Sequence, residues 1–197
     1  MREKIFYFAL GVLFSYGAFY SKHSPLSHVF AIEAFLFFIF QLYGDKIKKH
    51  PLFVPMPFDI NEYKFLLGYI ASEYLFFSYF IPKFRYNIIQ KSGAILLLIG
   101  FGLMLYIIYS LAFECNKMLY GGLYAHARHP FYVAAFLHLV GTLLYLGNTT
   151  SPVVVLYVLK NKFAHQLEEE EGVLLDRHSS YKEYKNNTPS GFFYIIK

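Results

Sequence analysis

Long apolar blocks separated by short polar segments dominate the chain. A helix needs about 20 apolar residues to cross a bilayer, so blocks of this kind indicate membrane-spanning helices. Proline or glycine lies in most connectors, where helices are expected to end and restart. The pattern predicts an all-α, polytopic membrane helix bundle of about six transmembrane helices, with five possible because several blocks are short. The blocks fall at about residues 5–20, 28–43, 63–81, 92–113, 130–146 and 152–164.

Composition also indicates a membrane protein. Hydrophobic residues make up 56% of the 197 residues and charged residues 16%, with a mean hydropathy of +0.38. The net charge of +5 lies mainly between the apolar blocks, which is typical of topology signals and lipid contact rather than of nucleic-acid binding. The single cysteine, Cys115, excludes an internal disulfide and a cysteine zinc cluster, and the histidines lack metal-ligand spacing.

The lysines and arginines predict which side of the membrane each connector faces. The first apolar block follows a basic start, and further apolar blocks follow it without a small-x-small cleavage pattern, so we expect it to be a span rather than a signal peptide. The basic residues favour a cytosolic N-terminus. The stretch 119–132 and the tail from residue 161 would then meet on the cytosolic face.

Two acidic residues, Glu33 and Glu73, lie inside apolar blocks. An ionised carboxylate in lipid costs several kcal/mol or more, so each is a candidate functional group. The alternative is a hydrogen-bonded residue that packs helices together, and both interpretations stay open.

Polar and cationic residues precede the fifth apolar block. The stretch 119–132 reads LYGGLYAHARHPFY and contains Arg128, His129 and Pro130 at the start of the apolar run. Proline is favoured at the first helical position, so this motif alone is also typical of an ordinary helix start, with His129 as a structural cap. For Arg128 we expect a structural or lipid-phosphate role rather than a catalytic one.

The tail carries four consecutive glutamates, residues 168–171, followed by a tyrosine-rich segment. Consecutive helical residues are about 100° apart, so at least one glutamate should face the protein if the helix continues from a span. We expect Glu168 and Glu169 to be solvated. Tyr181 and Tyr184 share a helical face and are expected to anchor a cytosolic C-terminal amphipathic helix at the membrane interface.

Several motifs together resemble one family. GLYAHARHPFYV, GTLLYLGN, EEEE and YKEYKNNTPSGFFYI, in this order, are similar to the C-terminal catalytic region of isoprenylcysteine carboxyl methyltransferases, and NEYKFLLGYIASEY resembles that family's earlier helices. The resemblance covers about residues 61–197. It implies a single integral membrane methyltransferase domain over 1–197, with an N-terminal helical hairpin at 1–60 and the catalytic region at 61–197.

The resemblance implies an enzyme of the endoplasmic reticulum membrane whose active site faces the cytosol. Such an enzyme uses S-adenosyl-L-methionine to methylate the C-terminal carboxylate of a prenylated cysteine in CaaX-processed proteins. Its partners would be farnesyl- or geranylgeranyl-cysteine C-termini and membrane lipid, with no nucleic acid and no metal. The resemblance assigns Gln166 to substrate binding, and it assigns the cofactor pocket to Asn116, Lys117, Met118, Leu119, Tyr124, His129, Pro130, Phe131, Tyr132 and Glu170.

These residue types suit that chemistry. An α-carboxylate has a pKa near 3.5 and is already ionised at neutral pH, so it needs no general base. His129 and Glu170 would therefore act by positioning. Aromatic faces can stabilise the cationic sulfonium of the cofactor.

Two departures from the family keep other functions open. The connector before Gly121 is shorter than in the family, with Asn116 in place of a histidine, and Gln166 stands where the family has an arginine. An amide cannot form the charge-assisted bidentate pair that guanidinium forms with a carboxylate. The alternatives are a phospholipid amine methyltransferase on the same fold and a degenerate, non-catalytic family member that acts as a membrane scaffold.

Overall fold

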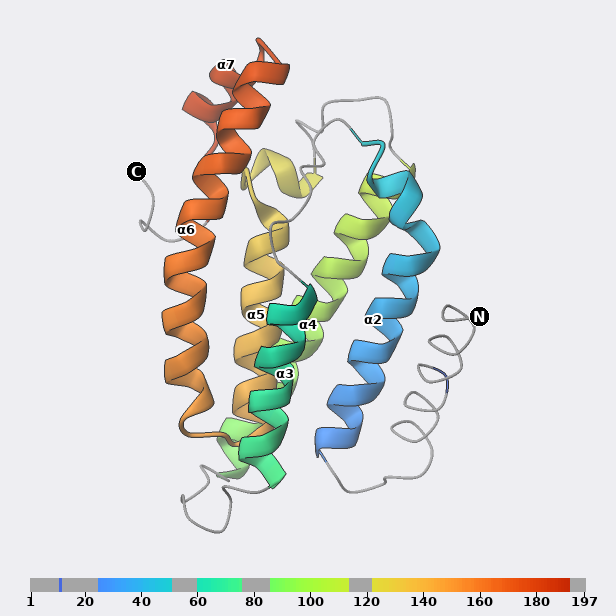
Figure 1. The fold of residues 1–197 in the computed structure, drawn as a ribbon, viewed down its shortest axis with the longest axis vertical. Coiled ribbons are helices and arrows are strands. Elements are labelled where there is room, and N and C mark those ends of the chain that lie inside the picture. The colour runs from blue at the N-terminus through green and yellow to red at the C-terminus, as the bar shows by residue number, and fades with distance from the viewer. Residues whose placement is uncertain (1–10, 12–24, 51–59, 76–85, 114–121, 192–197) are drawn as a thin grey trace.

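The described part of the chain is helical throughout. The computed structural model describes residue 11 and residues 25–50, 60–75, 86–113 and 122–191. Most of the helices run side by side along the long axis of the molecule, and α7 lies at one end (Figure 1). The all-α prediction is confirmed for these residues. The elements are α2 (Pro25–Ile47), α3 (Ile60–Leu75), α4 (Asn87–Phe113), the 3₁₀-helix η3 (Gly122–Ala125), α5 (Pro130–Leu146), α6 (Ser151–Arg177) and α7 (Tyr181–Asn187).

Two of these helices are long and apolar enough to cross a membrane. They are α2, with 23 residues, and α4, with 27, and their most apolar windows have mean hydropathies of 1.7 and 2.4. Helix α5 is apolar but has only 17 residues. The predicted block at 152–164 is the first half of α6, which continues without a break into the glutamate run. The predicted first span, 5–20, lies outside the described residues except for Gly11, so the count of six stays a prediction.

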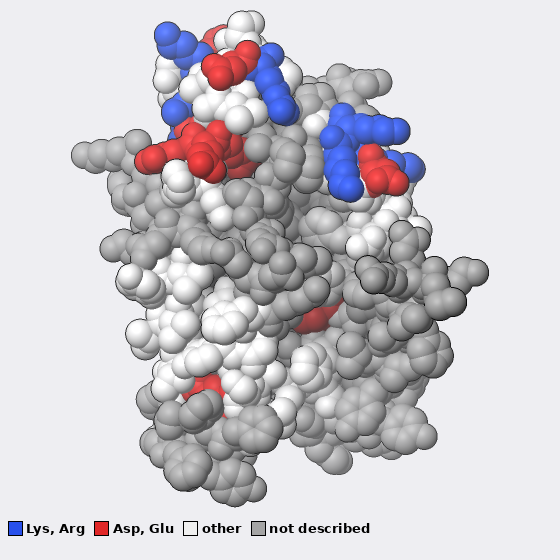
Figure 2. All heavy atoms as spheres, in the orientation of Figure 1, with Lys and Arg blue, Asp and Glu red and all other residues white. Residues whose placement is uncertain are grey.

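The surface of α4 suits lipid better than water. Ile88, Ile95, Leu98 and Ile99 are all exposed, and the side chain of Ile88 is 75% accessible. Exposed apolar residues on one long helix form a patch that soluble monomers seldom carry. On the face shown in Figure 2, lysine and arginine side chains instead gather near α7 and near the end of α2. On this face the described surface thus has a charged end and a mostly uncharged body, as expected for a membrane protein.

Glycines let α4 and α5 pack with their backbones almost in contact. A Cβ at Gly100 would collide with the backbone of His138, and a Cβ at Gly141 would collide with the backbone of Leu97. Small residues at such crossings are the usual means of close packing between membrane helices. Helix α5 then ends at Gly147, whose φ of 69° is the left-handed conformation that favours glycine. This packing fixes α5, and with it the motif at the start of α5.

Both acidic residues of the apolar blocks are buried and hydrogen-bonded. Glu33 of α2 lies 2.8 Å from Nε2 of His138 in α5. Glu73 of α3 accepts the backbone N–H groups of Thr149, Thr150 and Ser151 at 2.7, 2.8 and 2.6 Å, so its carboxylate caps the start of α6. These contacts bear out the helix-packing interpretation of Glu33 and Glu73.

Candidate functional site

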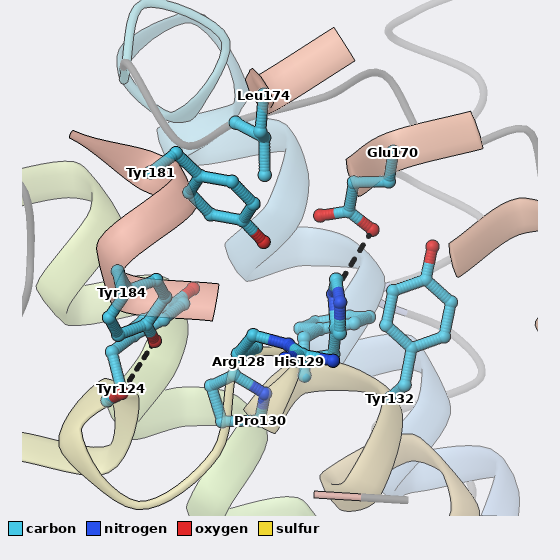
Figure 3. A pocket seen from close by; sticks show the side chains of 10 residues that line it. Tyr124, Arg128, His129, Pro130, Tyr132, Glu170, Leu174, Tyr181 and Tyr184 are labelled. Carbon is cyan, nitrogen blue, oxygen red and sulfur yellow. Dashed lines mark hydrogen bonds and ion pairs between the residues drawn. The ribbon is translucent and has the colours of Figure 1, made fainter. Parts of the chain in front are cut away.

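The candidate site lies where the start of α5 meets the second half of α6 and the short helix α7. Pro130 is the first residue of α5, a position at which its missing N–H costs nothing. His129 occupies the N-cap position, but its side chain makes no capping hydrogen bond. The side chain turns toward α6 instead (Figure 3). The capping interpretation of the His129 side chain is therefore wrong.

A buried carboxylate, that of Glu171, joins three groups that can carry positive charge. Its Oε1 lies 2.9 Å from Nε of Arg128 and 3.0 Å from Nε2 of His129, and its Oε2 lies 2.6 Å from Nζ of Lys185. The Glu171 side chain is only 8% exposed, whereas that of Lys185 is 39% exposed. Burial alone would raise the pKa of Glu171, but the hydrogen bonds from His129 and Lys185 and the charges of His129 and Arg128 lower it to about 2. Glu171 is therefore ionised at any physiological pH.

The other ring nitrogen of His129 faces Glu170. Nδ1 lies 3.6 Å from Oε2 of Glu170, which is too long for a hydrogen bond, and it is buried without a hydrogen-bond partner in the described part of the chain. Burial lowers the pKa of His129, but the two neighbouring glutamates outweigh that effect and leave its pKa raised. Nε2 of the imidazole is thus held by Glu171, whereas Nδ1 can accept or donate a further hydrogen bond.

Aromatic rings and these polar groups line one cleft (Figure 3). The cleft holds about 350 Å³ of empty space, including the part that is open to solvent. The hydroxyl of Tyr181, a residue only 1% exposed, has no hydrogen-bond partner among the described residues. Burial raises the pKa of Tyr181, so the phenol stays protonated and can donate. The lining residues are Tyr124, Arg128, His129, Pro130, Phe131, Tyr132, Glu170, Leu174, Tyr181 and Tyr184.

The segment after α7 is fastened to the motif at the start of α5. Arg128 Nη1 donates to the carbonyl oxygens of Lys185 and Thr188 at 2.6 and 3.1 Å. The backbone N–H groups of Arg128 and His129 donate to the carbonyl oxygens of Pro189 and Ser190 at 2.9 and 3.2 Å. The expected structural role of Arg128 is thus observed: this side chain ties the tail to the site.

The structure brings together most of the residues that the resemblance assigned to a cofactor pocket. Tyr124 comes from η3, Glu170 comes from α6, and the start of α5 supplies His129, Pro130, Phe131 and Tyr132. Asn116, Lys117, Met118 and Leu119 lie outside the described residues. Gln166, assigned to substrate, lies one helical turn before Glu170; it is buried and does not line the cleft. Its Oε1 has no hydrogen-bond partner where the structure describes the chain.

The glutamate run behaves as helical geometry predicts. Glu168 and Glu169 are exposed, Glu170 is half-buried and Glu171 is buried. The expectations that the first two are solvated and that at least one of the four faces the protein are both confirmed. The sequence did not single out Glu171, because periodicity does not say which of four identical neighbours turns inward.

The expected interfacial anchor is wrong for two tyrosines. Tyr181 and Tyr184 share a face of α7, as predicted, but they are buried against each other and Leu174. The hydroxyl of Tyr184 donates to the carbonyl oxygen of Tyr124 at 2.5 Å. Their spacing of three residues predicts a common face but not whether that face meets lipid or protein.

Fold and site define a helical protein with two candidate membrane spans and an aromatic cleft that contains a histidine and a carboxylate. Residues 107–176 match the model of the isoprenylcysteine carboxyl methyltransferase (ICMT) family, which confirms the resemblance over this stretch. The matched stretch contains the start of α5 and the glutamate run, which supply His129 and Glu170 to the cleft.

Two curated relatives agree with the family match. The chain is 38% identical over 71 residues to protein-S-isoprenylcysteine O-methyltransferase of Schizosaccharomyces pombe, which covers 36% of this chain and 30% of that protein. It is 37% identical over 75 residues to the protein of the same name from Saccharomyces cerevisiae, covering 38% of this chain and 31% of the relative. The similarity thus spans less than a third of the length of these relatives. No solved structure matches the chain.

Proposed function

We propose that this chain is an integral membrane methyltransferase that uses S-adenosyl-L-methionine to methylate the C-terminal carboxylate of a prenylated cysteine. The observation that carries the proposal is the meeting of His129 and Glu170 in one aromatic-lined cleft, within the stretch that matches the ICMT family. The names of the two relatives support the substrate class. CaaX-processed proteins, the endoplasmic reticulum membrane and a cytosol-facing site are parts of the same proposal, as is the bundle of about six spans.

The groups in the cleft fit the chemistry of the cofactor. When bound, S-adenosyl-L-methionine supplies a methyl group on a cationic sulfonium. The rings of Tyr124, Phe131 and Tyr132 would stabilise that cation through their faces. Nδ1 of His129 and the hydroxyl of Tyr181 are buried polar atoms with no hydrogen-bond partner in the described chain, so both can bind a ligand.

The protein has little proton transfer to perform in this reaction. The acceptor carboxylate is ionised at neutral pH, so its oxygen needs alignment with the methyl carbon rather than deprotonation. Glu170 would accept hydrogen bonds from the amino or hydroxyl groups of the cofactor, and His129 beside it would help to position the cofactor. Gln166, one turn before Glu170, would donate its amide N–H to the substrate carboxylate, and Asn116–Leu119 would complete the cofactor site.

The test is methyl transfer in membranes that contain the chain. Radiolabelled S-adenosyl-L-methionine and N-acetyl-farnesylcysteine should give a base-labile methyl ester. His129→Gln and Glu170→Gln should each reduce the rate at least about 100-fold, the scale of a lost positioning contact. Glu168→Gln, on the exposed face of the same helix, is the matched control and should leave the rate unchanged. Methylation that neither cleft substitution alters would overturn the assignment.

Nδ1 of His129 favours one second candidate function. A phospholipid amine methyltransferase needs a proton acceptor near its nucleophile, and Nδ1 of His129 is buried with no hydrogen-bond partner in the described residues. In that case the label would appear in the lipid extract as a base-stable product. A chain that transfers no label and binds no cofactor by calorimetry would instead be a membrane scaffold.

A further inference from the structure

We propose that Lys185 is a positioning residue for the function proposed above: by pairing with Glu171, it limits the protonation of His129 and so keeps Glu170 available to bind a ligand. Lys185 belongs to α7, outside the stretch that matches the ICMT family. Its Nζ lies 2.6 Å from Oε2 of Glu171, the carboxylate whose other oxygen holds His129. Lys185 therefore acts on His129 through one intervening group, the carboxylate of Glu171.

The charges around Glu171 already exceed its own without a proton on the histidine. Arg128 at 2.9 Å is cationic at any working pH, and Lys185 at 2.6 Å adds a second positive charge. Two cations therefore face one carboxylate. A positive charge on His129 is attracted by Glu170 and Glu171 and repelled by these two cations, so the pairing of Lys185 with Glu171 weakens one of the two attractions. Without Lys185, Glu171 would attract a proton on His129 more strongly, although Arg128 would still contact it.

The charge of His129 decides whether the Glu170 carboxylate bonds to His129 or stays available to a ligand. A carboxylate only accepts hydrogen bonds, so Nε2 of His129, 3.0 Å from Glu171, carries a proton in either state. The charge therefore depends on Nδ1, which faces Glu170 at 3.6 Å. A proton on Nδ1 would draw Glu170 into a charge-assisted hydrogen bond and take it from the cleft. An uncharged ring leaves the Glu170 carboxylate available.

Other groups near His129 set the balance that Lys185 shifts. Burial favours the neutral imidazole, but the two glutamates outweigh burial and leave the pKa of His129 raised even with Lys185 in place. The phenols around the ring stay neutral near pH 7, so they do not compete with Lys185 for control of its charge. The titratable or charged groups around the ring are Glu170 and Glu171 of α6, Lys185, Tyr181 and Tyr184 of α7, Tyr132 of α5, Tyr124 of η3 and the neighbouring Arg128.

The direct test is an NMR titration of the full chain in detergent micelles. Protein labelled with ¹³C at histidine is titrated from pH 5 to 9, and the His129 signal is assigned by its loss in His129→Gln. Lys185→Met should move the titration midpoint of His129 upward by about half a pH unit, the size expected for loss of one partly exposed charge. Lys185→Arg should restore the wild-type midpoint. Lys182→Met, an exposed lysine on the same helix, should leave it unchanged.

A second readout links the charge to ligand binding. Affinity for S-adenosylhomocysteine, measured by calorimetry across the same pH range, should begin to fall at a higher pH in Lys185→Met than in wild type. Lys185→Gln should behave as Lys185→Met does and replaces it if the Met variant does not fold. An unchanged or lowered midpoint of His129 overturns the proposal, and so does a shifted midpoint with an unshifted binding profile. A wild-type chain that binds the cofactor product but transfers no methyl group overturns the proposed function instead.

Discussion

Glu171→Gln should weaken the folded state more than any other single change in the glutamate run. The buried carboxylate of Glu171 contacts Arg128, His129 and Lys185 at 2.9, 3.0 and 2.6 Å. A glutamine keeps the size and one acceptor oxygen but loses the charge. The cations then face one another without their common counter-charge.

The expected loss follows from how far each cation is removed from water. Removing one partner of a buried ion pair costs about 3–5 kcal/mol. The Lys185 side chain is 39% exposed and can return to solvent, while the Arg128 guanidinium keeps two backbone carbonyl oxygens as acceptors. We therefore expect a smaller loss for Glu171→Gln, about 2–3 kcal/mol of unfolding free energy. For a chain of this size the melting temperature would fall by about 4–12 °C.

The assay is thermal unfolding of the detergent-solubilised chain, followed by circular dichroism at several pH values. The folded pKa of Glu171 is about 2, below its ordinary value of 4.5. Its contribution is therefore complete above pH 4.5 and is lost as the pH falls from 4.5 toward 2. Glu171→Gln has no carboxylate to protonate at this position, so it should lose less stability in acid than the wild type does. The melting temperatures of the wild type and of Glu171→Gln should therefore converge at low pH.

The matched control is Glu169→Gln. Glu169 is exposed and pairs only at 3.4 Å with the exposed His165 where the structure describes the chain, so the change should cost about 0.5 kcal/mol or less. Equal melting temperatures for Glu169→Gln and Glu171→Gln at pH 7 would refute the reasoning. A gap that persists unchanged at pH 3 would show that charge is not the cause.

Three further predictions concern the frame and the substrate. Glu73→Ala, which removes the cap of α6, should cost about 2–4 kcal/mol by thermal unfolding, and Glu73→Gln should cost clearly less; equal costs would mean that charge plays no part in the cap. Gly141→Ala should destabilise the chain because its Cβ would meet the backbone of Leu97, whereas Gly102→Ala, with open space around it, should be neutral or stabilising; the opposite order of melting temperatures would contradict the packing. If the proposed function holds, Gln166→Ala should raise the KM for N-acetyl-farnesylcysteine about tenfold and leave the cofactor affinity unchanged, and an unchanged KM would remove Gln166 from the substrate site.

The start of α5 could be predicted from the sequence in nearly all respects. The proline at the first helical position, the apolar run behind it and the polar residues before it each have a local cause, so His129 and Pro130 lie where the pattern indicates. The helical character of the chain has the same origin, because long apolar blocks allow few other structures in lipid. Local sequence patterns of this kind therefore predict where helices lie and where α5 begins.

The partners of the site residues could not be predicted in the same way. The sequence cannot show that Lys185, fourteen residues after Glu171, returns to that carboxylate, because the return depends on the turn between α6 and α7. Nor can it show that Tyr181 meets Leu174 rather than lipid. The fate of each acidic residue in the apolar blocks depends on a helix far away in the chain, as with Glu33 and His138. These contacts are tertiary, and no local spacing specifies them.

The rotation of α6 about its own axis decides which glutamate serves the cleft. Successive residues differ by about 100°, so a shift of one position would exchange the roles of Glu170 and Glu171. Contacts hold this rotation at both ends of the 27-residue helix: Glu73 binds the backbone at its start, and Arg128 and Lys185 bind Glu171 near its end. The cleft therefore depends on the carboxylate that caps the start of α6 as well as on its own lining residues. The start of α6 lies at the opposite end of the molecule from α7 (Figure 1). This is the physical reason why two carboxylates, those of Glu73 and Glu171, matter to the site without lining it.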